Sequence, residues 1–324
     1  MIVEMSFQIH SEGVTERKRN TMEYVLRTEN LTKVYGKKKV VDGVSMHVRK
    51  GDIYGFIGKN GAGKTTFMRM VAGLASSSQG TVELFGSDEV EKQRKRIGTL
   101  IENPGVYPNM TARENLEIIR RSFGITDKNR VDEMLTLVGL EHAGKKKVKN
   151  FSMGMKQRLG IAISMFSGPD FLILDEPING LDPEGIREIR ELLLKLNRER
   201  DITILISSHI LGELSKIATH YGIIKNGVLI DEFDADELSE RCRRCHKLVV
   251  NDVESASRIL EEKLNITQYD VPEPGILRVF ENLEQTQRTN RELIQNNVEV
   301  IESYLVGQDL EGYFMEILGG SEDV

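Results

Sequence analysis

The chain of 324 residues lacks tryptophan, contains only two cysteines, and has no apolar run near the roughly 20 residues that a membrane-spanning helix requires. The two cysteines exclude a disulfide scaffold and suit a reducing compartment. No apolar core follows the charges of the N-terminus, so no secretory signal is expected. The 44 basic and 50 acidic residues give a net charge of −6, which argues against the whole molecule as a surface for nucleic acid.

Hydrophobic residues make up 39% of the chain and charged residues 29%, as in ordinary soluble globular proteins, and the length predicts about two domains. Residues 1–21 are polar and aperiodic, and we expect a weakly ordered extension, either an alternative start or an artefact. From residue 22 to about 234, short apolar runs alternate with amphipathic stretches. The apolar runs 53–57, 171–174 and 202–206 predict strands buried on both faces, hence an α/β domain with a parallel sheet covered by helices.

Four helices are predicted within this domain, over residues 64–74, 112–123, 131–138 and 183–200. A charged linker helix is expected over residues 235–245. Residues 246–324 show a different pattern of predicted elements. Strand-like and helical segments come in the order β-α-β-β-α-β, before a last helix at 309–318. That order is typical of a small ferredoxin-like α+β module.

The first motif that carries chemistry is a glycine-rich loop between the apolar run 53–57 and the helix predicted to follow. It fits the pattern G-x-x-x-x-G-K-[ST]. It consists of Gly58, Lys59, Asn60, Gly61, Ala62, Gly63, Lys64, Thr65 and Thr66. Glycines let several backbone N–H groups face one anion, and the helix N-terminus adds partial positive charge. Lys64 is expected between the β- and γ-phosphates of a nucleotide, and the Thr65 hydroxyl on Mg²⁺.

Two carboxylates, Asp175 and Glu176, follow the apolar run 171–174. Ligands of open α/β sheets bind at the carboxyl ends of the strands, so both side chains are expected beside the phosphates. Adjacent residues of a strand point to opposite faces, so the two acids can take different roles. Asp175 is expected to hold Mg²⁺ and Glu176 to orient or deprotonate the attacking water. A solvated strand end is the alternative for this pair taken alone.

A third motif, Phe-Ser-Met-Gly-Met-Lys-Gln-Arg at residues 151–158, precedes a helical run. It resembles the signature of the ATP-binding cassette (ABC) ATPases, usually Leu-Ser-Gly-Gly-Gln. Ser152 and Gly154 are kept, whereas Met153 and Met155 replace the first glycine and the glutamine. The resemblance implies that Ser152 and Gly154 reach the γ-phosphate of a nucleotide bound by a second subunit. The alternative is an N-cap serine without a ligand.

The resemblance extends to three further positions. Tyr35 matches the aromatic residue that stacks on adenine, although a packing tyrosine fits equally well. Asp182, in the run Asn-Gly-Leu-Asp-Pro, matches the D-loop aspartate that lies across the dimer interface. His209 follows an apolar strand and matches the switch histidine, which contacts the γ-phosphate and helps to hold Glu176 and the water. A lone histidine at a strand end is otherwise usually a surface residue.

One departure concerns the glutamine that the family normally carries after an Ile-Gly-x-Leu strand. Here the strand-like residues 97–101 are followed by Glu102. A glutamate can still ligate a cation such as Mg²⁺, but it adds negative charge beside the phosphates. This glutamate, the motif at residues 151–158 and the run Asp-Glu-Pro-Ile-Asn-Gly-Leu-Asp-Pro are similar to those of the bacitracin-resistance and lantibiotic-immunity exporter branch.

The resemblance implies a P-loop NTPase fold of ABC ATPase type over residues 22–234, with an antiparallel β subdomain and a helical subdomain at about 103–166. It implies an ATPase subunit that uses ATP and Mg²⁺ and closes as a homodimer, or as a heterodimer with a related subunit. A separate membrane permease would export a peptide antibiotic, drug or lipid-like substrate, with this chain peripheral on the cytoplasmic face and no nucleic-acid partner. The alternative is a soluble ABC ATPase acting on ribosomes or nucleic acid.

The run Cys-Arg-Arg-Cys-His, which contains Cys242, Cys245 and His246, matches the haem-attachment pattern C-x-x-C-H. A haem requires an exported chain and a pocket, and a structural zinc site requires a fourth ligand. A redox-active cysteine pair is a further alternative. We expect instead two small residues in a linker helix without chemistry of their own.

Overall fold

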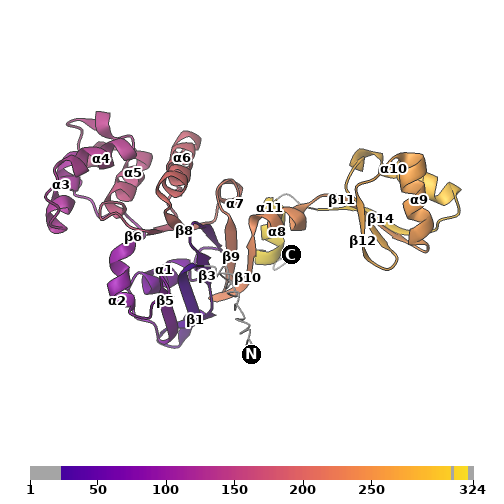
Figure 1. Ribbon diagram of the computed structural model, residues 1–324, viewed down its shortest axis with the longest axis horizontal. Coiled ribbons are helices and arrows are strands. Elements are labelled where there is room, and N and C mark those ends of the chain that lie inside the picture. The colour runs from indigo at the N-terminus through magenta and orange to yellow at the C-terminus, as the bar shows by residue number, and fades with distance from the viewer. Residues whose placement is uncertain (1–22, 308–309, 320–324) are drawn as a thin grey trace, which may run out of the picture.

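The computed structural model describes residues 23–307 and 310–319. Figure 1 shows a large α/β body, here called the main domain (residues 23–234), and a smaller α+β body, the accessory module (residues 245–306). Helix α8 (Ala235–Cys242) lies between them. The extension predicted for residues 1–21 lies outside the described residues.

A six-stranded sheet in the order β10-β9-β4-β8-β7-β6 forms the centre of the main domain. Neighbouring strands are parallel except β9 and β10, which form an antiparallel pair at one edge. The strands are β4 (Ile53–Ile57), β6 (Ile97–Leu100), β7 (Phe171–Asp175), β8 (Thr203–Ser208), β9 (His220–Lys225) and β10 (Val228–Asp234).

The central strands bury large side chains on both faces of this sheet. Along β7, Leu172 and Leu174 pack into one hydrophobic cluster, while Phe171 and Ile173 pack into another on the opposite face. Because both faces are covered, polar residues cannot alternate with apolar ones, which explains the continuous apolar runs in the sequence. The predicted α/β class with a parallel-sheet core is confirmed.

One face of the large sheet is covered by α1 (Lys64–Val71), which packs in turn against a second, antiparallel sheet. That sheet and the short helix after it consist of β1 (Tyr24–Tyr35), β2 (Lys38–Val44), β3 (His47–Arg49), β5 (Gln79–Leu84) and α2 (Val90–Gln93). Short 3₁₀ turns occur at Arg94–Arg96, Glu141–Ala143, Val148–Asn150 and Leu283–Gln285.

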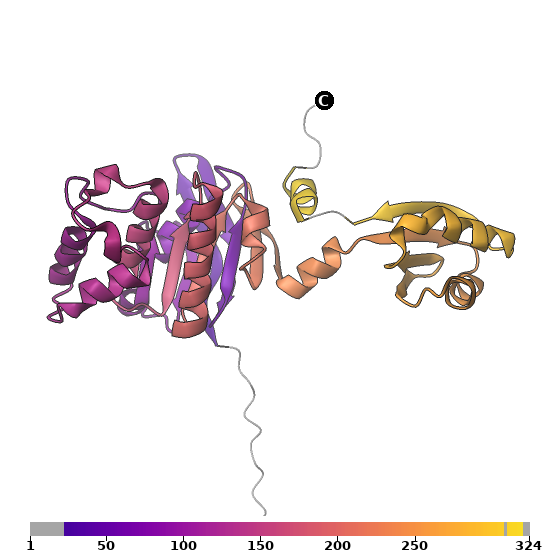
Figure 2. The same ribbon diagram turned by 90° about the horizontal axis from the view of Figure 1, so that it is seen from above.

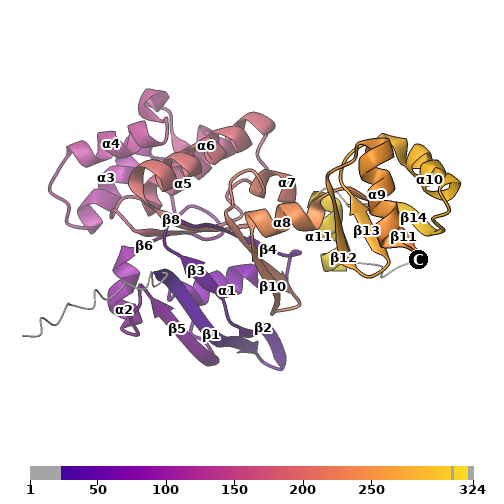
Figure 3. The ribbon, with the colours of Figure 1, turned by 45° about the vertical axis from the view of Figure 1, so that its right-hand side comes forward.

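The other face of the large sheet is covered by helices, whose apolar sides form one cluster with the strands. Figure 3 shows α3, α4 and α5 gathered into a helical layer next to α6. The helices are α3 (Ala112–Ser122), α4 (Asn129–Leu137), α5 (Met153–Ser164), α6 (Pro183–Arg200) and α7 (Leu211–Leu214).

Capping side chains determine where three of these helices begin. Thr111 and Glu114 form a reciprocal capping box at the start of α3. The side chains of Ser152 and Asp182 each accept a backbone N–H from the first turn of α5 and α6, respectively. Each cap satisfies a donor that the helix itself leaves unpaired.

Helix α1 is shorter than its sequence pattern predicts. The pattern indicates residues 64–74, but the helix ends at Val71. Gly73 adopts left-handed backbone (φ 77°), and the Arg94 guanidinium donates to the carbonyls of Met70 and Val71 at 3.3 and 3.2 Å. These bonds occupy acceptors that another helical turn would have used.

The accessory module has a hydrophobic core of its own between two helices and a four-stranded antiparallel sheet in the order β12-β13-β11-β14. Leu248, Leu260, Leu277 and Leu293 are fully buried there. Its elements, in the chain order β-α-β-β-α-β, are β11 (Cys245–Val250), α9 (Val253–Leu264), β12 (Tyr269–Glu273), β13 (Ile276–Val279), α10 (Thr286–Gln295) and β14 (Val300–Val306). Figure 2 shows that the module stands away from the main domain, beyond α8.

Helix α8 ends before the predicted limit of residue 245. Cys242 is its last residue, and Arg243 takes extended backbone (φ −60°, ψ 119°). Cys245 then opens β11 opposite Val306, so it belongs to the sheet of the accessory module and not to the linker helix. Burial raises the pKa of the Cys245 thiol, which disfavours the reactive thiolate.

The last helix, α11 (Leu310–Gly319), leaves the accessory module and packs against the main domain. The fully buried ring of Phe314 lies 6.4 Å from the ring of Tyr221 and 6.5 Å from that of Phe233, centre to centre. The Arg241 guanidinium in α8 donates to the Tyr313 hydroxyl at 2.9 Å. The accessory module is therefore attached to the main domain at both of its ends.

Replacing Phe314 by alanine removes the ring that joins α11 to the β9–β10 pair. Replacing a buried phenylalanine by alanine lowers the free energy of unfolding by about 3–5 kcal/mol. We expect this loss of stability to appear as undocking of α11. Hydrogen–deuterium exchange should then rise in residues 310–319. Ile294→Ala, at a position 60% exposed, is the control and should leave exchange there unchanged. Equal exchange in Phe314→Ala and wild type would contradict this role of the ring.

Candidate active site

The strand order brings three separate loops to one edge of the large sheet. Strand β8 lies between β4 and β7, so Ser207 pairs with Phe56 on one side and with Asp175 on the other. The glycine-rich loop follows β4, Asp175 ends β7 with Glu176 directly after it, and His209 follows β8. All three therefore lie at the carboxyl edge, where ligands of such sheets bind.

The glycine-rich loop closes tightly around the start of α1. A Cβ at Gly58 would lie 2.5 Å from the Ile224 carbonyl oxygen, and one at Gly63 would lie 2.6 Å from that of Val40, so a side chain fits at neither position. Gly63 also has φ 111°, which favours glycine. The loop borders a cavity of about 160 Å³ lined by Val40, Asn60, Gly61, Ala62, Gly63, Lys64, Thr65, Thr66 and Glu176.

The Lys64 ammonium group is buried at this cavity. Its Nζ atom donates to the Gly58 carbonyl at 2.5 Å and lies 3.4 Å from that of Lys59. It also lies 3.3 Å from Glu176 Oε1. A buried cation held only by carbonyls and one carboxylate remains a strong attractor for a phosphate group entering the loop.

Asp175 is bonded by a hydroxyl on each side. The Thr65 hydroxyl donates to Oδ2 and the Ser207 hydroxyl donates to Oδ1, both at 2.6 Å. A threonine hydroxyl beside an aspartate carboxylate, next to a phosphate loop, is the hard-oxygen donor set that Mg²⁺ prefers. The residues present therefore fit a magnesium ion.

Glu176 is held in left-handed backbone, with φ 50°. Its N–H donates to the Ser207 hydroxyl at 2.9 Å, and its Oε2 lies 2.7 Å from His209 Nδ1. Its Oε1 is buried without a hydrogen bond, because the nearby Lys64 ammonium group is near enough for an ion pair but is not aligned for a hydrogen bond. An unfavourable backbone conformation of this kind persists only where the surrounding hydrogen bonds and packing hold it in place. The arrangement leaves one carboxylate oxygen ready to accept a proton.

The structure does not bring Ser152, Gly154, Asp182 or Tyr35 to this cavity, since none of them lines it. The Ser152 and Asp182 side chains cap their own helices. Tyr35 is half-exposed, with the Lys33 ammonium 5.0 Å above its ring.

Glu102, expected near the metal, is not among the residues that line this cavity. It has left-handed backbone (φ 65°) and pairs with Arg69 of α1, with 2.7 Å between Glu102 Oε1 and the guanidinium.

Ser207 is a site residue that the sequence motifs did not single out. Its hydroxyl bonds both Asp175 and Glu176, and it is fully buried. Its position two residues before His209 was visible in the sequence. Its role depends on β8 lying next to β7, which the sequence alone does not reveal.

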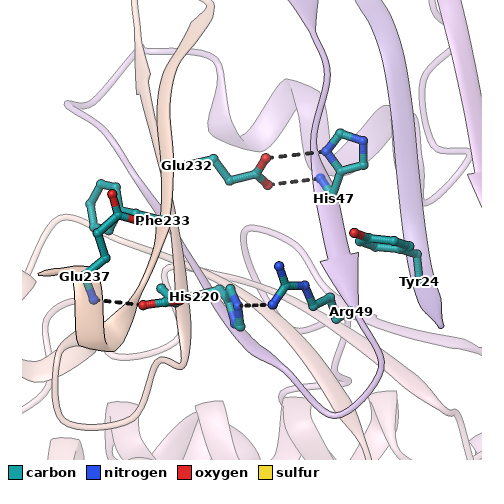
Figure 4. Close-up of a pocket in the computed structure, with 8 residues that line it drawn as sticks. Tyr24, His47, Arg49, His220, Glu232, Phe233 and Glu237 are labelled. Carbon is teal, nitrogen blue, oxygen red and sulfur yellow. Dashed lines mark hydrogen bonds and ion pairs between the residues drawn. The ribbon is translucent and has the colours of Figure 1, made fainter. Parts of the chain in front are cut away.

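A second cavity, of about 230 Å³, lies where β3, β9 and β10 meet the start of α8 (Figure 4). The His47 N–H donates to Glu232 Oε1 at 3.0 Å, and the Arg49 guanidinium lies 3.0 Å from His220 Nε2. The Tyr54 hydroxyl donates to Glu232 at 2.8 Å, and burial followed by the charge of Glu232 raises the pKa of Tyr54 well above its usual value. The polar groups here already partner one another.

The Cys-Arg-Arg-Cys-His run is split between two elements. Cys242 ends α8, whereas Cys245 and His246 lie in β11, where His246 Nε2 is 2.8 Å from the Ser303 hydroxyl. Burial lowers the pKa of His246. Over residues 23–307 and 310–319, no group of three or more histidine, cysteine or acidic side chains is arranged to hold a metal ion.

Comparisons with known proteins decide the family. A family model described as ABC transporter matches residues 41–179. The chain is 45% identical over 302 residues to the bacitracin transport ATP-binding protein BcrA of Bacillus licheniformis, covering 92% of this chain and 99% of that protein. The chain belongs to the ATP-binding subunits of ABC transporters. ATP binding and ATP hydrolysis, which the motifs predicted, are therefore activities of this chain, and the cavity of the phosphate loop is its candidate ATP site.

Two further similarities agree with this family. The lantibiotic transport ATP-binding protein SrtF of Streptococcus pyogenes is 42% identical over 215 residues, covering 66% of this chain and 93% of that protein. The solved dimeric structure of MJ0796, a bacterial ABC transporter cassette, matches with a TM-score of 0.58 at 25% identity, over 65% of this chain and 98% of that one. The transport prediction is confirmed, and the alternative of a soluble ABC ATPase acting on ribosomes is not supported.

Within the described residues, no helix is both long enough and apolar enough to cross a membrane.

Ser207→Ala in this ABC ATPase should lower kcat for ATP hydrolysis by about 10-fold or more, because hydrogen bonds to charged groups contribute about 1.5–3 kcal/mol. The KM for ATP should change little, since Ser207 does not line the phosphate-loop cavity. Steady-state kinetics of the purified transporter measures both. Ser208→Ala is the matched control, because the Ser208 hydroxyl accepts from the Ile210 N–H and contacts neither acid. Wild-type kcat in Ser207→Ala would refute the role given to this hydroxyl.

Proposed function

We propose that this chain powers the export of a peptide antibiotic, drug or lipid-like substrate through a separate membrane permease, using Mg²⁺·ATP. The observation that carries the proposal is the similarity to BcrA along almost the whole chain, accessory module included. The shorter similarity to a lantibiotic transport protein points to the same substrate class.

The chain acts as a peripheral subunit on the cytoplasmic face of the membrane. Residues 22–234 form the ATPase domain, with a helical subdomain at about 103–166 that faces the permease. Tyr107 and Phe123 support this placement, because both are large apolar side chains of that subdomain and are 53% and 57% exposed. Residues 235–244 form the linker to the accessory module (residues 245–306).

Two copies, or this chain and a related subunit, enclose ATP head to tail. In this arrangement Ser152 and Gly154 of one subunit meet the γ-phosphate held by the phosphate loop of the other, and Asp182 lies across the interface. Supporting this proposal, Ser152 and Asp182 are both exposed at helix N-termini, and neither lines the cavity of its own chain. Helix N-termini stabilise anions, so such a site is completed from outside.

Hydrolysis proceeds by attack of water on the γ-phosphorus, with the β-phosphate oxygen of ADP as the leaving group. Lys64 binds the β- and γ-phosphates, and Thr65 and Asp175 hold Mg²⁺, which neutralises phosphate charge when bound. Glu176 accepts the proton of the water at Oε1, the oxygen without a hydrogen bond, while His209 positions the carboxylate through Oε2. Tyr35 stacks on the adenine ring.

Glu176→Gln should reduce ATP turnover by about 10²–10⁴-fold, the scale of a lost general base. ATP binding should persist, so ATP-bound dimers should accumulate and be seen by size-exclusion chromatography with light scattering. Glu191→Gln, at an exposed position on α6, is the matched control and should behave as wild type. Near-normal turnover in Glu176→Gln would refute the assignment of the base.

Deleting the gene for this chain from its native host should make the cells more sensitive to bacitracin-like or lantibiotic peptides. Wild-type chain supplied from a plasmid should restore resistance, whereas the Glu176→Gln variant should not, since export requires hydrolysis. Minimal inhibitory concentrations measure the effect, and affinity purification should recover a polytopic membrane protein. Unchanged sensitivity to all such peptides would contradict the proposed substrate class.

A further inference from the structure

Helix α1 presents two side chains one turn apart, and each contacts a carboxylate at the edge of the large sheet. Thr65 donates to Asp175 at the end of β7 at 2.6 Å, and Arg69 pairs with Glu102 after β6 at 2.7 Å. Residues four apart lie on the same face of a helix, about 6 Å apart along its axis. One face of α1 therefore binds Asp175 and Glu102 in successive turns.

Glu102 has fewer partners to balance its negative charge than Asp175 and Glu176 have. Asp175 is bonded by two hydroxyls, and Glu176 by an imidazole with a lysine nearby. Within residues 23–307 and 310–319, Arg69 is the one cation within ion-pair distance of Glu102. Strands β6 and β7 are neighbours, so this third carboxylate lies at the edge where the phosphates of ATP bring more negative charge.

We propose that Arg69 is a positioning residue that neutralises Glu102 and holds it along α1, so that ATP enters a phosphate loop flanked by a carboxylate without repulsion. Without the arginine, the carboxylate is free to turn toward the phosphates. A neutral glutamine at this position creates no such repulsion and needs no such partner. The effect of Arg69 on ATP affinity therefore depends on the charge at position 102. This inference rests on the binding of ATP at the phosphate loop.

The solvent exposure of the Arg69 and Glu102 side chains determines how strongly Arg69→Gln should affect ATP affinity. The Arg69 and Glu102 side chains are 39% and 56% exposed, so solvent and salt screen part of their interaction. We expect Arg69→Gln to weaken ATP binding about 3- to 10-fold at low salt. The loss should shrink at high salt, because the repulsion that replaces the pair is screened in the same way.

The decisive experiment is a double-mutant cycle on the full-length chain, read as equilibrium binding of a fluorescent ATP analogue in EDTA, so that neither hydrolysis nor metal contributes. Arg69→Gln should raise Kd in the wild-type background but change it less than about 2-fold in the Glu102→Gln background. Arg69→Lys, which keeps the charge, should retain most of the affinity. Arg94→Gln is the matched control, since Arg94 bonds the C-terminal end of the same helix but not Glu102.

A second readout uses Mn²⁺ in place of Mg²⁺, with free Mn²⁺ measured by electron paramagnetic resonance. Arg69→Gln should leave Mn²⁺ bound with ATP at least as tightly as in wild type, because a released Glu102 adds an oxygen donor near Thr65 and Asp175. General damage to the fold would lower the affinity for both ATP and Mn²⁺. A loss of ATP affinity alone therefore distinguishes the proposed role of Arg69 from such damage.

Equal loss of ATP affinity from Arg69→Gln in both backgrounds would overturn the proposal, because the arginine would then act independently of Glu102. Loss of affinity in Arg94→Gln as large as in Arg69→Gln would also overturn it. If the wild-type chain itself failed to bind the analogue, the proposed function would fall, and this inference with it. If the wild-type chain bound the analogue but the effect of Arg69→Gln did not depend on the residue at position 102, this inference alone would be overturned.

Discussion

The hydroxyl of Ser207 is the interaction on which the site depends. It donates to Asp175 and accepts from the Glu176 N–H, so it links the residue fitted for magnesium and the residue fitted as base to strand β8. This is possible because β8 lies between β4 and β7 in the large sheet. The same order places the phosphate loop on the other side of β8. A buried hydroxyl that bonds two functional residues fixes the position of one relative to the other. Glu176 adopts left-handed backbone in this arrangement, which is energetically unfavourable for a residue other than glycine.

In the proposed head-to-tail assembly, one chain supplies half of the surface that an ATP molecule requires. The phosphate loop, the two acids and His209 converge on one edge, whereas Ser152 and Asp182 cap helices on surfaces of their own. A helix N-terminus whose cap is exposed presents further amide groups to whatever approaches it. The proposed head-to-tail assembly uses this property, since ATP would supply the negative charge that both halves lack. Binding and subunit closure are then one equilibrium, and hydrolysis removes the shared ligand.

The accessory module is tied to the ATPase domain at two places and not by a single linker. Helix α8 leads out of the domain, and α11 returns to place Phe314 against Tyr221 and Phe233 next to the β9–β10 pair. Two attachments restrict how the module turns relative to the domain, because a rotation that is free about one linker strains the other. The module has a hydrophobic core of its own, as an independently folding domain does.

The phosphate loop, the central strands and helix α6 were predictable from the sequence, because each depends on residues close together in the chain: glycines before a lysine, continuous apolar runs, and an aspartate cap followed by Pro183. The resemblance to a known family, not local pattern, supplied His209 and Ser152. The bonds of Ser207, the pairing of Arg69 with Glu102 and the return of Phe314 to Phe233 were not predictable. Each joins segments distant in sequence, and only the order of strands and the packing of helices decide which distant side chains meet.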